Sequence, residues 1–176
     1  FIGLVANNGG KPLVAPPGGY DPVIATNPVG IGIPTLSDPI LVDMATSKRA
    51  WGEVRLCEKQ CRDLPPATFF NKNGQFAVKA VDACSVLPAG DYKGFAIGLL
   101  IEILTGSLVD MPMGPHKLMG DYRTIPRGGF ILVINPASFT TVRRFKNANS
   151  ELVKEIKDSK KLLRAPEIII PGERAM

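Results

Sequence analysis

The sequence is poor in residues that bind metals or react as nucleophiles, with three cysteines and one histidine in 176 residues. Three cysteines cannot all pair with one another, so reduced thiols are the expectation. The spacing of Cys57 and Cys61 puts them on one face of a helix, but with Cys84 and His116 they match no zinc-finger or zinc-ribbon pattern. We therefore predict no metal site.

Uninterrupted apolar runs of membrane-spanning length are also missing. The most apolar helix candidate, Phe95 to Val109, contains Glu102 and is too short to cross a bilayer, so we expect a buried core helix. Phe1 to Ala6 has no basic n-region and no initiator methionine, so it is read neither as a signal peptide nor as a natural start. The expectation is a cytoplasmic protein that binds no membrane, with further chain upstream.

Acidic residues are outnumbered, which gives a net charge of +5. The basic residues gather in 143–146 and 154–164, where Val142, Phe145, Leu152 and Ile156 keep helical spacing. This pattern predicts an amphipathic helix with a solvated basic face. No aromatic residues alternate with the charges and no known module is present, so nucleic-acid binding is not expected.

The glycine fingerprint of Rossmann domains, G-x-G-x-x-G, does not occur either. Gly30 and Gly32 lie inside a strand pattern, and no third glycine opens a helix behind them. A dinucleotide, if one binds, is bound in another way.

The order of apolar runs and breakers predicts α+β structure in a single domain over residues 1–176. Several strands follow one another without an intervening helix, which favours a mixed, largely antiparallel sheet covered by helices in a two-layer sandwich. A Gly/Pro-rich loop over 111–129 is a candidate lid. Strands are predicted over 1–6, 23–26, 29–33, 40–42, 130–134 and 167–170, and helices from about 47 to 60, from 90 to 110 and from about 138.

The segment Pro39–Ser47 is the most informative stretch. Four apolar residues lead into Asp43 and then into the hydroxyls of Thr46 and Ser47, ahead of a helix-forming segment. The free N–H groups and dipole of a helix N-terminus bind phosphate, so the N–H groups of Ala45 to Ser47 are candidates to face a diphosphate, and Thr46 or Ser47 can cap the helix. Asp43 would accept hydrogen bonds from a cofactor, or would only cap the helix.

Two further places suggest a ligand. Lys93 stands near a helix start, where the dipole disfavours a cation, so an anionic partner explains it unless it is an exposed loop lysine. Pro171, Gly172 and Glu173 follow the last predicted strand and either wrap a nucleotide or form a tight turn.

Five blocks together resemble the malate/L-lactate dehydrogenases of the second type, which include ureidoglycolate, sulfolactate and 2,3-diketogulonate enzymes and are unrelated to Rossmann-type lactate dehydrogenases. They occur in the family's order and span nearly the whole chain. They are Ala15-Pro-Pro-Gly-Gly19, Ala25-Thr-Asn-Pro28, Val42-Asp-Met-Ala-Thr-Ser47, Gly90-Asp-Tyr-Lys-Gly94 and Pro171-Gly-Glu173.

The resemblance implies a central nucleotide-binding domain of non-Rossmann type. In these enzymes NAD or NADP exchanges hydride with a 2-hydroxy/2-oxo acid or a cyclic imino acid, and the complete protein forms a homodimer. The positions that match cofactor contacts are Asp43, Met44, Ala45, Thr46, Ser47, Tyr92, Lys93, Pro171, Gly172 and Glu173. The family's catalytic histidine comes from a helical segment upstream of Phe1, so no catalytic residue is assigned within this chain.

The chain also departs from the family pattern. His116 lies in a loop that matches no family motif and is not assigned a catalytic role, and Gly129 stands where the family often has histidine. The family's helical C-terminal tail is absent, and Arg174 does not decide between NAD and NADP. The alternative function is a non-catalytic interaction domain whose basic helix binds an acidic partner.

Overall fold

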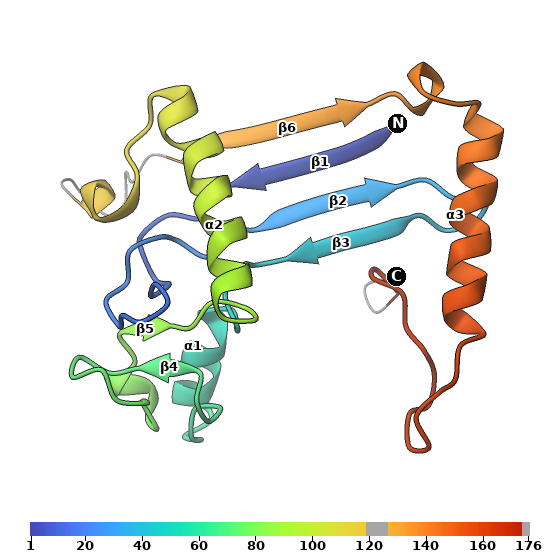
Figure 1. Cartoon of the computed structure of the whole chain (residues 1–176). Helices are drawn as coiled ribbons and strands as arrows, with labels where there is room; N and C mark the ends of the chain where they lie inside the picture. Colours follow the sequence, from blue (N-terminus) through green and yellow to red (C-terminus); the bar gives the residue numbers. More distant parts are fainter. Residues whose placement is uncertain (119–126, 174–176) are drawn as a thin grey trace. The chain divides into compact units, whose positions relative to one another are not determined.

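The computed structural model describes residues 1–118 and 127–173. Figure 1 shows the order of elements along the chain. The strands are β1 (Ile2–Asn7), β2 (Val29–Ile33), β3 (Ile40–Met44), β4 (Phe69–Phe70), β5 (Ser85–Val86) and β6 (Gly129–Ile134). The α-helices are α1 (Gly52–Lys59), α2 (Tyr92–Thr105) and α3 (Val142–Lys157), and short 3-10 turns occupy Ala80–Asp82, Ser107–Val109, Gly114–Leu118 and Pro136–Ser138.

The main sheet has four strands in the order β3-β2-β1-β6, and neighbouring strands run in opposite directions (Figure 1). A second sheet consists of β4 and β5, which pair antiparallel with Phe69 opposite Val86. The prediction of mixed helices and strands with an antiparallel sheet is therefore confirmed.

The chain divides into two compact units. Unit 1 contains residues 1–5, 30–44 and 131–176, and unit 2 contains residues 6–29 and 45–130. The prediction that the whole chain acts as one nucleotide-binding domain stays a prediction, and each unit is described by itself below.

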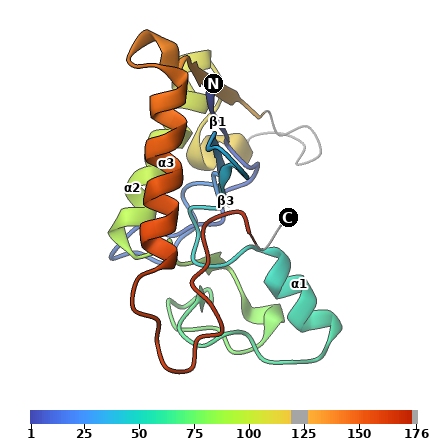
Figure 2. The ribbon, with the colours of Figure 1, turned by 90° about the vertical axis from the view of Figure 1, so that its right-hand side faces the viewer.

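Unit 1 consists of most of the main sheet and α3. Thr141 caps α3, because its hydroxyl accepts a hydrogen bond from the N–H of Arg144 at 3.2 Å. The helix crosses one end of the strands (Figures 1 and 2), and Asn149 Nδ2 donates to the carbonyl of Pro34 at 3.0 Å. No residue of α3 is fully buried. Its predicted apolar stripe therefore remains partly exposed.

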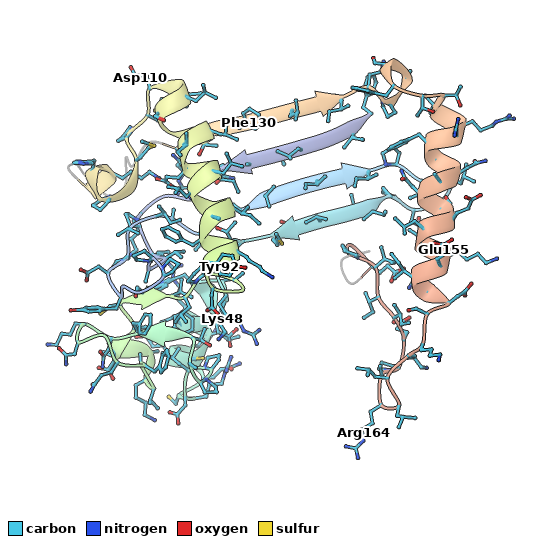
Figure 3. All side chains as sticks on the ribbon, viewed as in Figure 1. Lys48, Tyr92, Asp110, Phe130, Glu155 and Arg164 are labelled. Carbon is cyan, nitrogen blue, oxygen red and sulfur yellow. The ribbon has the colours of Figure 1, made fainter. Side chains whose placement is uncertain are left out.

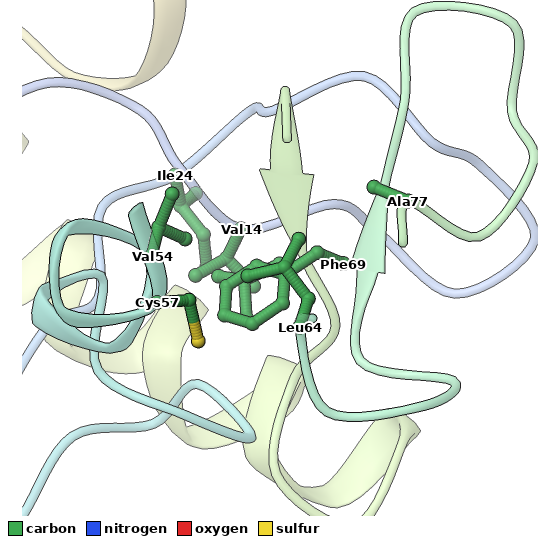
Figure 4. Close-up of a cluster of buried hydrophobic side chains, with 8 residues drawn as sticks. Val14, Ile24, Val54, Cys57, Leu64, Phe69 and Ala77 are labelled. Carbon is green, nitrogen blue, oxygen red and sulfur yellow. The ribbon is translucent and has the colours of Figure 1, made fainter. Parts of the chain in front are cut away.

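Unit 2 contains the main apolar cluster of the described residues. The side chains come from loops, from α1 and from the β4–β5 pair, so the cluster joins segments that are distant in sequence (Figure 4). Phe69 and Cys57 are fully buried in it, and the Trp51 ring meets Phe69 edge-on at 5.9 Å between centroids. The members are Val14, Ile24, Val54, Cys57, Leu64, Phe69, Ala77 and Val86.

Helix α2 is only half buried, which corrects the prediction of a core helix. Its buried residues are two glycines, Glu102, Thr105 and a single large apolar residue, Ile101, whereas four large apolar side chains are 41–55% exposed. The continuous stretch Tyr92–Val109 is long and apolar enough to cross a membrane by length and composition alone, although core helices of other proteins meet the same criterion. The absence of a membrane partner thus stays a prediction. The four exposed residues are Ile97, Leu99, Leu100 and Ile103.

Several predicted boundaries were wrong. Residues 23–26 form only an isolated bridge between Val14 and Ile24, because no strand runs alongside them for longer. Residues 167–170 have no strand partner, and the N–H of Leu41 reaches this tail only at the carbonyl of Pro171, at 3.1 Å. The third helix begins at Val142 because Pro136–Ser138 forms a separate 3-10 turn. The middle of the candidate lid, residues 119–126, lies outside the described residues.

Strand β6 is an edge strand of the main sheet. Figure 3 labels Phe130 near its start and shows side chains standing off the strands of the sheet. Ile131 and Val133 are 74% and 60% exposed, and Leu132, between them, is 41% exposed. Because neighbouring side chains in a strand alternate between faces, both faces of this apolar strand are open.

Candidate functional site

The segment 45–47 does not begin a helix, which corrects the prediction of a phosphate site at a helix N-terminus. Helix α1 starts at Gly52, five residues after Ser47, and has no side-chain cap. The hydroxyl of Thr46 donates instead to the carbonyl of Thr26 at 3.0 Å, and that of Ser47 to the carbonyl of Arg49 at 2.8 Å. Both side chains are buried and serve the turn rather than a cap.

The backbone of this turn nevertheless offers hydrogen-bond donors. The N–H of Thr46 donates to Thr26, whereas those of Ala45 and Ser47 donate to no acceptor within residues 1–118 and 127–173. The free N–H groups of Ala45 and Ser47 flank the hydrogen-bonded N–H of Thr46, and such a pair of donors suits an anionic oxygen ligand. Backbone N–H groups of this turn can therefore still bind a phosphate, although they do not belong to a helix N-terminus.

Two of the blocks meet in unit 2, and Gly94 is the contact. A Cβ at Gly94 would lie 2.2 Å from the carbonyl oxygen of Ala89 and 2.7 Å from that of Thr46. The N–H of Ala89 also donates to the carbonyl of Thr46 at 2.9 Å. Only glycine allows α2 to approach the 45–47 turn this closely.

Tyr92 and Lys93 form the first turn of α2, as predicted, and both side chains are exposed (Figure 3 labels Tyr92). Asp91 precedes them with a φ of 54°, in the left-handed region that non-glycine residues seldom adopt. Within the described residues Lys93 makes no side-chain hydrogen bond or ion pair. Its ammonium is free to meet an anion at the helix start.

A third block places Asn27 in a buried polar network of unit 2. Asn27 Nδ2 donates to the carbonyl of Gly98 at 2.8 Å and to Glu102 Oε2 at 2.7 Å. Glu102 Oε1 accepts from the N–H of Gly114 at 2.9 Å and lies 2.5 Å from Lys117 Nζ. Asn27, Glu102 and Lys117 are each at least 97% buried. In the described chain Asn27 Oδ1 has no hydrogen-bond partner, and Lys117 Nζ has no partner besides its ion pair with Glu102.

In unit 1 the predicted residues Asp43 and Met44 are exposed at the end of β3. Asp43 lines a shallow hollow of about 380 Å³ on the sheet, whose floor includes Gly3, Gly30 and Gly32. The missing side chains of these glycines leave the backbone accessible to a flat ligand.

The Pro171–Glu173 block forms a turn beside β3. Gly172 has a φ of 105°, and a Cβ there would lie 2.9 Å from Leu41 Cβ. Glu173 Oε2 accepts from Lys157 Nζ at 2.6 Å and from the N–H of Ile170 at 2.9 Å, and these bonds, led by that from Lys157, lower the pKa of Glu173. These contacts support the interpretation of Pro171–Glu173 as a tight turn. Its contact with a cofactor stays a prediction.

Unit 2 also has a cleft of about 560 Å³ that sequence reasoning missed. Its walls include glycines, the single tryptophan and three cations from separate segments, and it borders Ala45 of the predicted site. The run of glycines before Lys11 was a visible signal, whereas the position of Arg127 depends on tertiary contacts. The lining residues are Gly9, Gly10, Lys11, Leu13, Thr26, Ala45, Ala50, Trp51, Gly52, Arg55 and Arg127.

The described part of the chain contains no group of three or more histidine, cysteine, aspartate or glutamate residues placed to hold a metal. Cys57 is buried, while Cys61 and Cys84 are exposed free thiols. His116 lies exposed in the 3-10 turn Gly114–Leu118.

Comparison with known proteins gives a consistent set of matches. A family model described as malate/L-lactate dehydrogenase matches residues 1–176. The chain is 35% identical over 179 residues to the malate/(S)-sulfolactate dehydrogenase of Methanothermus fervidus, covering 99% of this chain and 51% of that relative. It is 30% identical over 161 residues to the ureidoglycolate dehydrogenase (NAD(+)) of Escherichia coli, covering 89% of this chain and 46% of that relative.

Solved structures agree with the sequence matches. The sulfolactate dehydrogenase from Methanocaldococcus jannaschii superposes with a TM-score of 0.85 at 30% identity, over 98% of this chain and 50% of that one. The malate dehydrogenase from Entamoeba histolytica, at 22% identity and a TM-score of 0.89, shares the fold. The chain thus spans about half the length of the relatives it matches.

Proposed function

Because the chain belongs to the malate/L-lactate dehydrogenase family, we propose that the protein it represents is an NAD(P)-dependent oxidoreductase. Its substrates are 2-hydroxy acids and the corresponding 2-oxo acids, as the names of the malate and sulfolactate enzymes suggest. Relatives at this similarity also include a pyrroline-2-carboxylate reductase, so a cyclic imino acid is a further candidate.

One observation carries the proposal: two blocks far apart in sequence meet in unit 2 and leave unused groups that suit a nucleotide phosphate. These groups are the N–H groups of Ala45 and Ser47 and the ammonium of Lys93. A charged ammonium and backbone donors together satisfy an anionic oxygen by charge-assisted hydrogen bonds. The residues present therefore fit a dinucleotide, and the domain binds it without a Rossmann fingerprint.

When bound, the nicotinamide accepts or donates the hydride of the reaction. The chain's own residues bind and orient: Ala45 and Ser47 through the backbone, and Lys93 through its side chain. In unit 1, Asp43 and the Pro171–Glu173 turn are the further proposed contacts. The proton of the substrate hydroxyl is handled by a histidine outside the sequence shown, since histidine titrates near neutral pH.

The remaining attributes follow from family membership and composition. We propose a cytoplasmic homodimer that acts on small molecules and binds neither nucleic acid nor membrane, with its sheet and helices forming a two-layer sandwich. The proposed cofactor is NAD or NADP, and titration with both reduced forms distinguishes them. Arg174 lies outside the described residues.

Trp51 makes the cofactor test direct. It is the single tryptophan and lines the cleft that borders Ala45, so its emission reports on ligands bound there. Titration with NADH and NADPH should quench this emission saturably for at least one cofactor. If neither cofactor quenches, and calorimetry also detects no binding, the proposal fails.

A second candidate function is an interaction domain that binds an acidic partner through α3. The observation in its favour is that Val142, Leu152 and Ile156 are 39–51% exposed although they form the helix's apolar stripe. Binding of NADH or NADPH to the folded chain would favour the enzyme. A folded chain that binds neither cofactor would favour the interaction domain.

A further inference from the structure

The missed cleft in unit 2 concentrates positive charge without a matching carboxylate. Lys11, Arg55 and Arg127 come from three separate segments, and no aspartate or glutamate is among the described residues that line the cleft. Like charges that share a concave site repel one another and raise the local potential. An ordinary protein surface pairs or spreads such charges.

The nearest acidic residue along α1 is already engaged. Glu53 Oε1 accepts from Arg62 Nη2 at 2.5 Å, and that bond lowers the pKa of Glu53. None of the ion pairs in the described chain involves the three cleft cations. Their charge is therefore available to a ligand.

The backbone directly after Arg127 is held at Gly128 by a clamp centred on Asn8, which is fully buried. Asn8 Oδ1 accepts from the N–H of Gly128 at 2.9 Å, and the N–H of Asn8 donates back to the carbonyl of Gly128 at 3.3 Å. Asn8 Nδ2 donates to the carbonyl of Thr105 at 3.2 Å, which ties the pair to the end of α2. A Cβ at Gly128 would fall on the Thr105 carbonyl oxygen, so this position requires glycine.

Asn8 also shapes the chain ahead of Lys11. The N–H of Gly10 donates to the carbonyl of Asn8 at 2.6 Å, which closes a tight turn ahead of Lys11. Gly10 has a φ of 103°, and a Cβ there would lie 3.7 Å from Arg127 Nε and Nη2. The guanidinium thus lies beside bare backbone, and one buried residue, Asn8, binds the backbone next to both Lys11 and Arg127.

We propose that this cleft binds a small ligand carrying at least two negative charges, with Arg127 as the principal contact and Asn8 as its positioning residue. A guanidinium offers a planar fork that matches carboxylate and phosphate oxygens, and Lys11 and Arg55 supply the second charge contact. The volume suits a small molecule. In naming the natural ligand this inference rests on the proposed function: the two sources are the diphosphate of the cofactor and a dicarboxylate substrate.

The test uses Trp51 emission, checked by calorimetry, on the full chain at constant ionic strength. Pyrophosphate represents the diphosphate source, malonate the dicarboxylate source, and acetate the singly charged control. At least one dianion should bind saturably and at least tenfold more tightly than acetate, and the tighter of the two identifies the source. If neither binds more tightly than acetate, the inference is wrong.

Variants separate a built site from general electrostatics. Arg127→Gln should weaken dianion binding at least tenfold, whereas Arg144→Gln, a charge-matched change on α3 outside the cleft, should leave it unchanged. Equal losses in both variants would overturn the proposal. Binding of pyrophosphate or malonate by a chain that binds neither NADH nor NADPH would refute the proposed function and leave this inference standing.

The positioning role of Asn8 has its own readout. If Asn8 acts through Arg127, the double variant Asn8→Ala/Arg127→Gln should bind no more weakly than Arg127→Gln alone. Additive losses would show that Asn8 does not position Arg127. Should Asn8→Ala fail to fold, Asn8→Ser replaces it in the same cycle.

Discussion

The buried pair of Glu102 and Lys117 gives the sharpest prediction on stability. Replacing Glu102 by leucine leaves the Lys117 ammonium, which is fully buried, without a counter-charge. It also removes the acceptor of the Gly114 N–H and one of the two acceptors of Asn27 Nδ2. Breaking a buried pair by removing one partner costs about 3–5 kcal/mol of unfolding free energy. We expect Glu102→Leu to lose this much.

The double variant Glu102→Leu/Lys117→Met distinguishes charge from packing. It removes both charges, so its unfolding free energy should lie within about 2 kcal/mol of the parent, the remaining loss coming from the unsatisfied Gly114 N–H. Urea denaturation followed by Trp51 emission measures unit 2, which contains both residues. Glu58→Leu, on the exposed face of α1, is the matched control. A double variant as unstable as Glu102→Leu would refute the electrostatic argument.

Three further predictions concern the family blocks. Gly94→Ala should cost about 3 kcal/mol by overpacking against two carbonyl oxygens, and a thermal shift of unit 2 measures it; full stability would contradict the close approach. Lys93→Ala should weaken cofactor binding by about 1.5–3 kcal/mol through loss of a charged contact, with unchanged affinity in a titration as the opposing result. Because the pKa of Glu173 is lowered, its contribution to the C-terminal turn is present above the pKa of an unfolded glutamate and disappears as the pH falls through the lower folded pKa. The amide resonance of Ile170 should follow that midpoint, and Lys157→Met should move it upward.

Sequence patterns predicted the parts of the fold that depend on local periodicity. The alternation of apolar residues with glycine located β2, and the apolar run before Asp43 located β3. The amphipathic spacing around Phe145 located α3, although the helix begins at Val142, capped by Thr141, rather than near residue 138. In each case the information lies within one turn or one strand.

What could not be predicted depends on partners distant in sequence. The hydroxyls of Thr46 and Ser47 stand ahead of a helix-forming segment, but that of Thr46 donates to the carbonyl of Thr26, twenty residues earlier, and the helix begins only at Gly52. The position of Arg127 in the cleft depends on Asn8, more than a hundred residues away in sequence. No local pattern encodes either contact.

The open edge of β6 has a consequence for how the protein behaves in concentrated solution. An apolar edge strand with exposed faces is a template on which another copy's strand can add, and the run Phe130-Ile-Leu-Val-Ile134 contains no charge or proline to block it. Any preparation that leaves this edge uncovered should aggregate as concentration rises. Replacing Ile131 by lysine would place a gatekeeper charge there and raise the solubility limit.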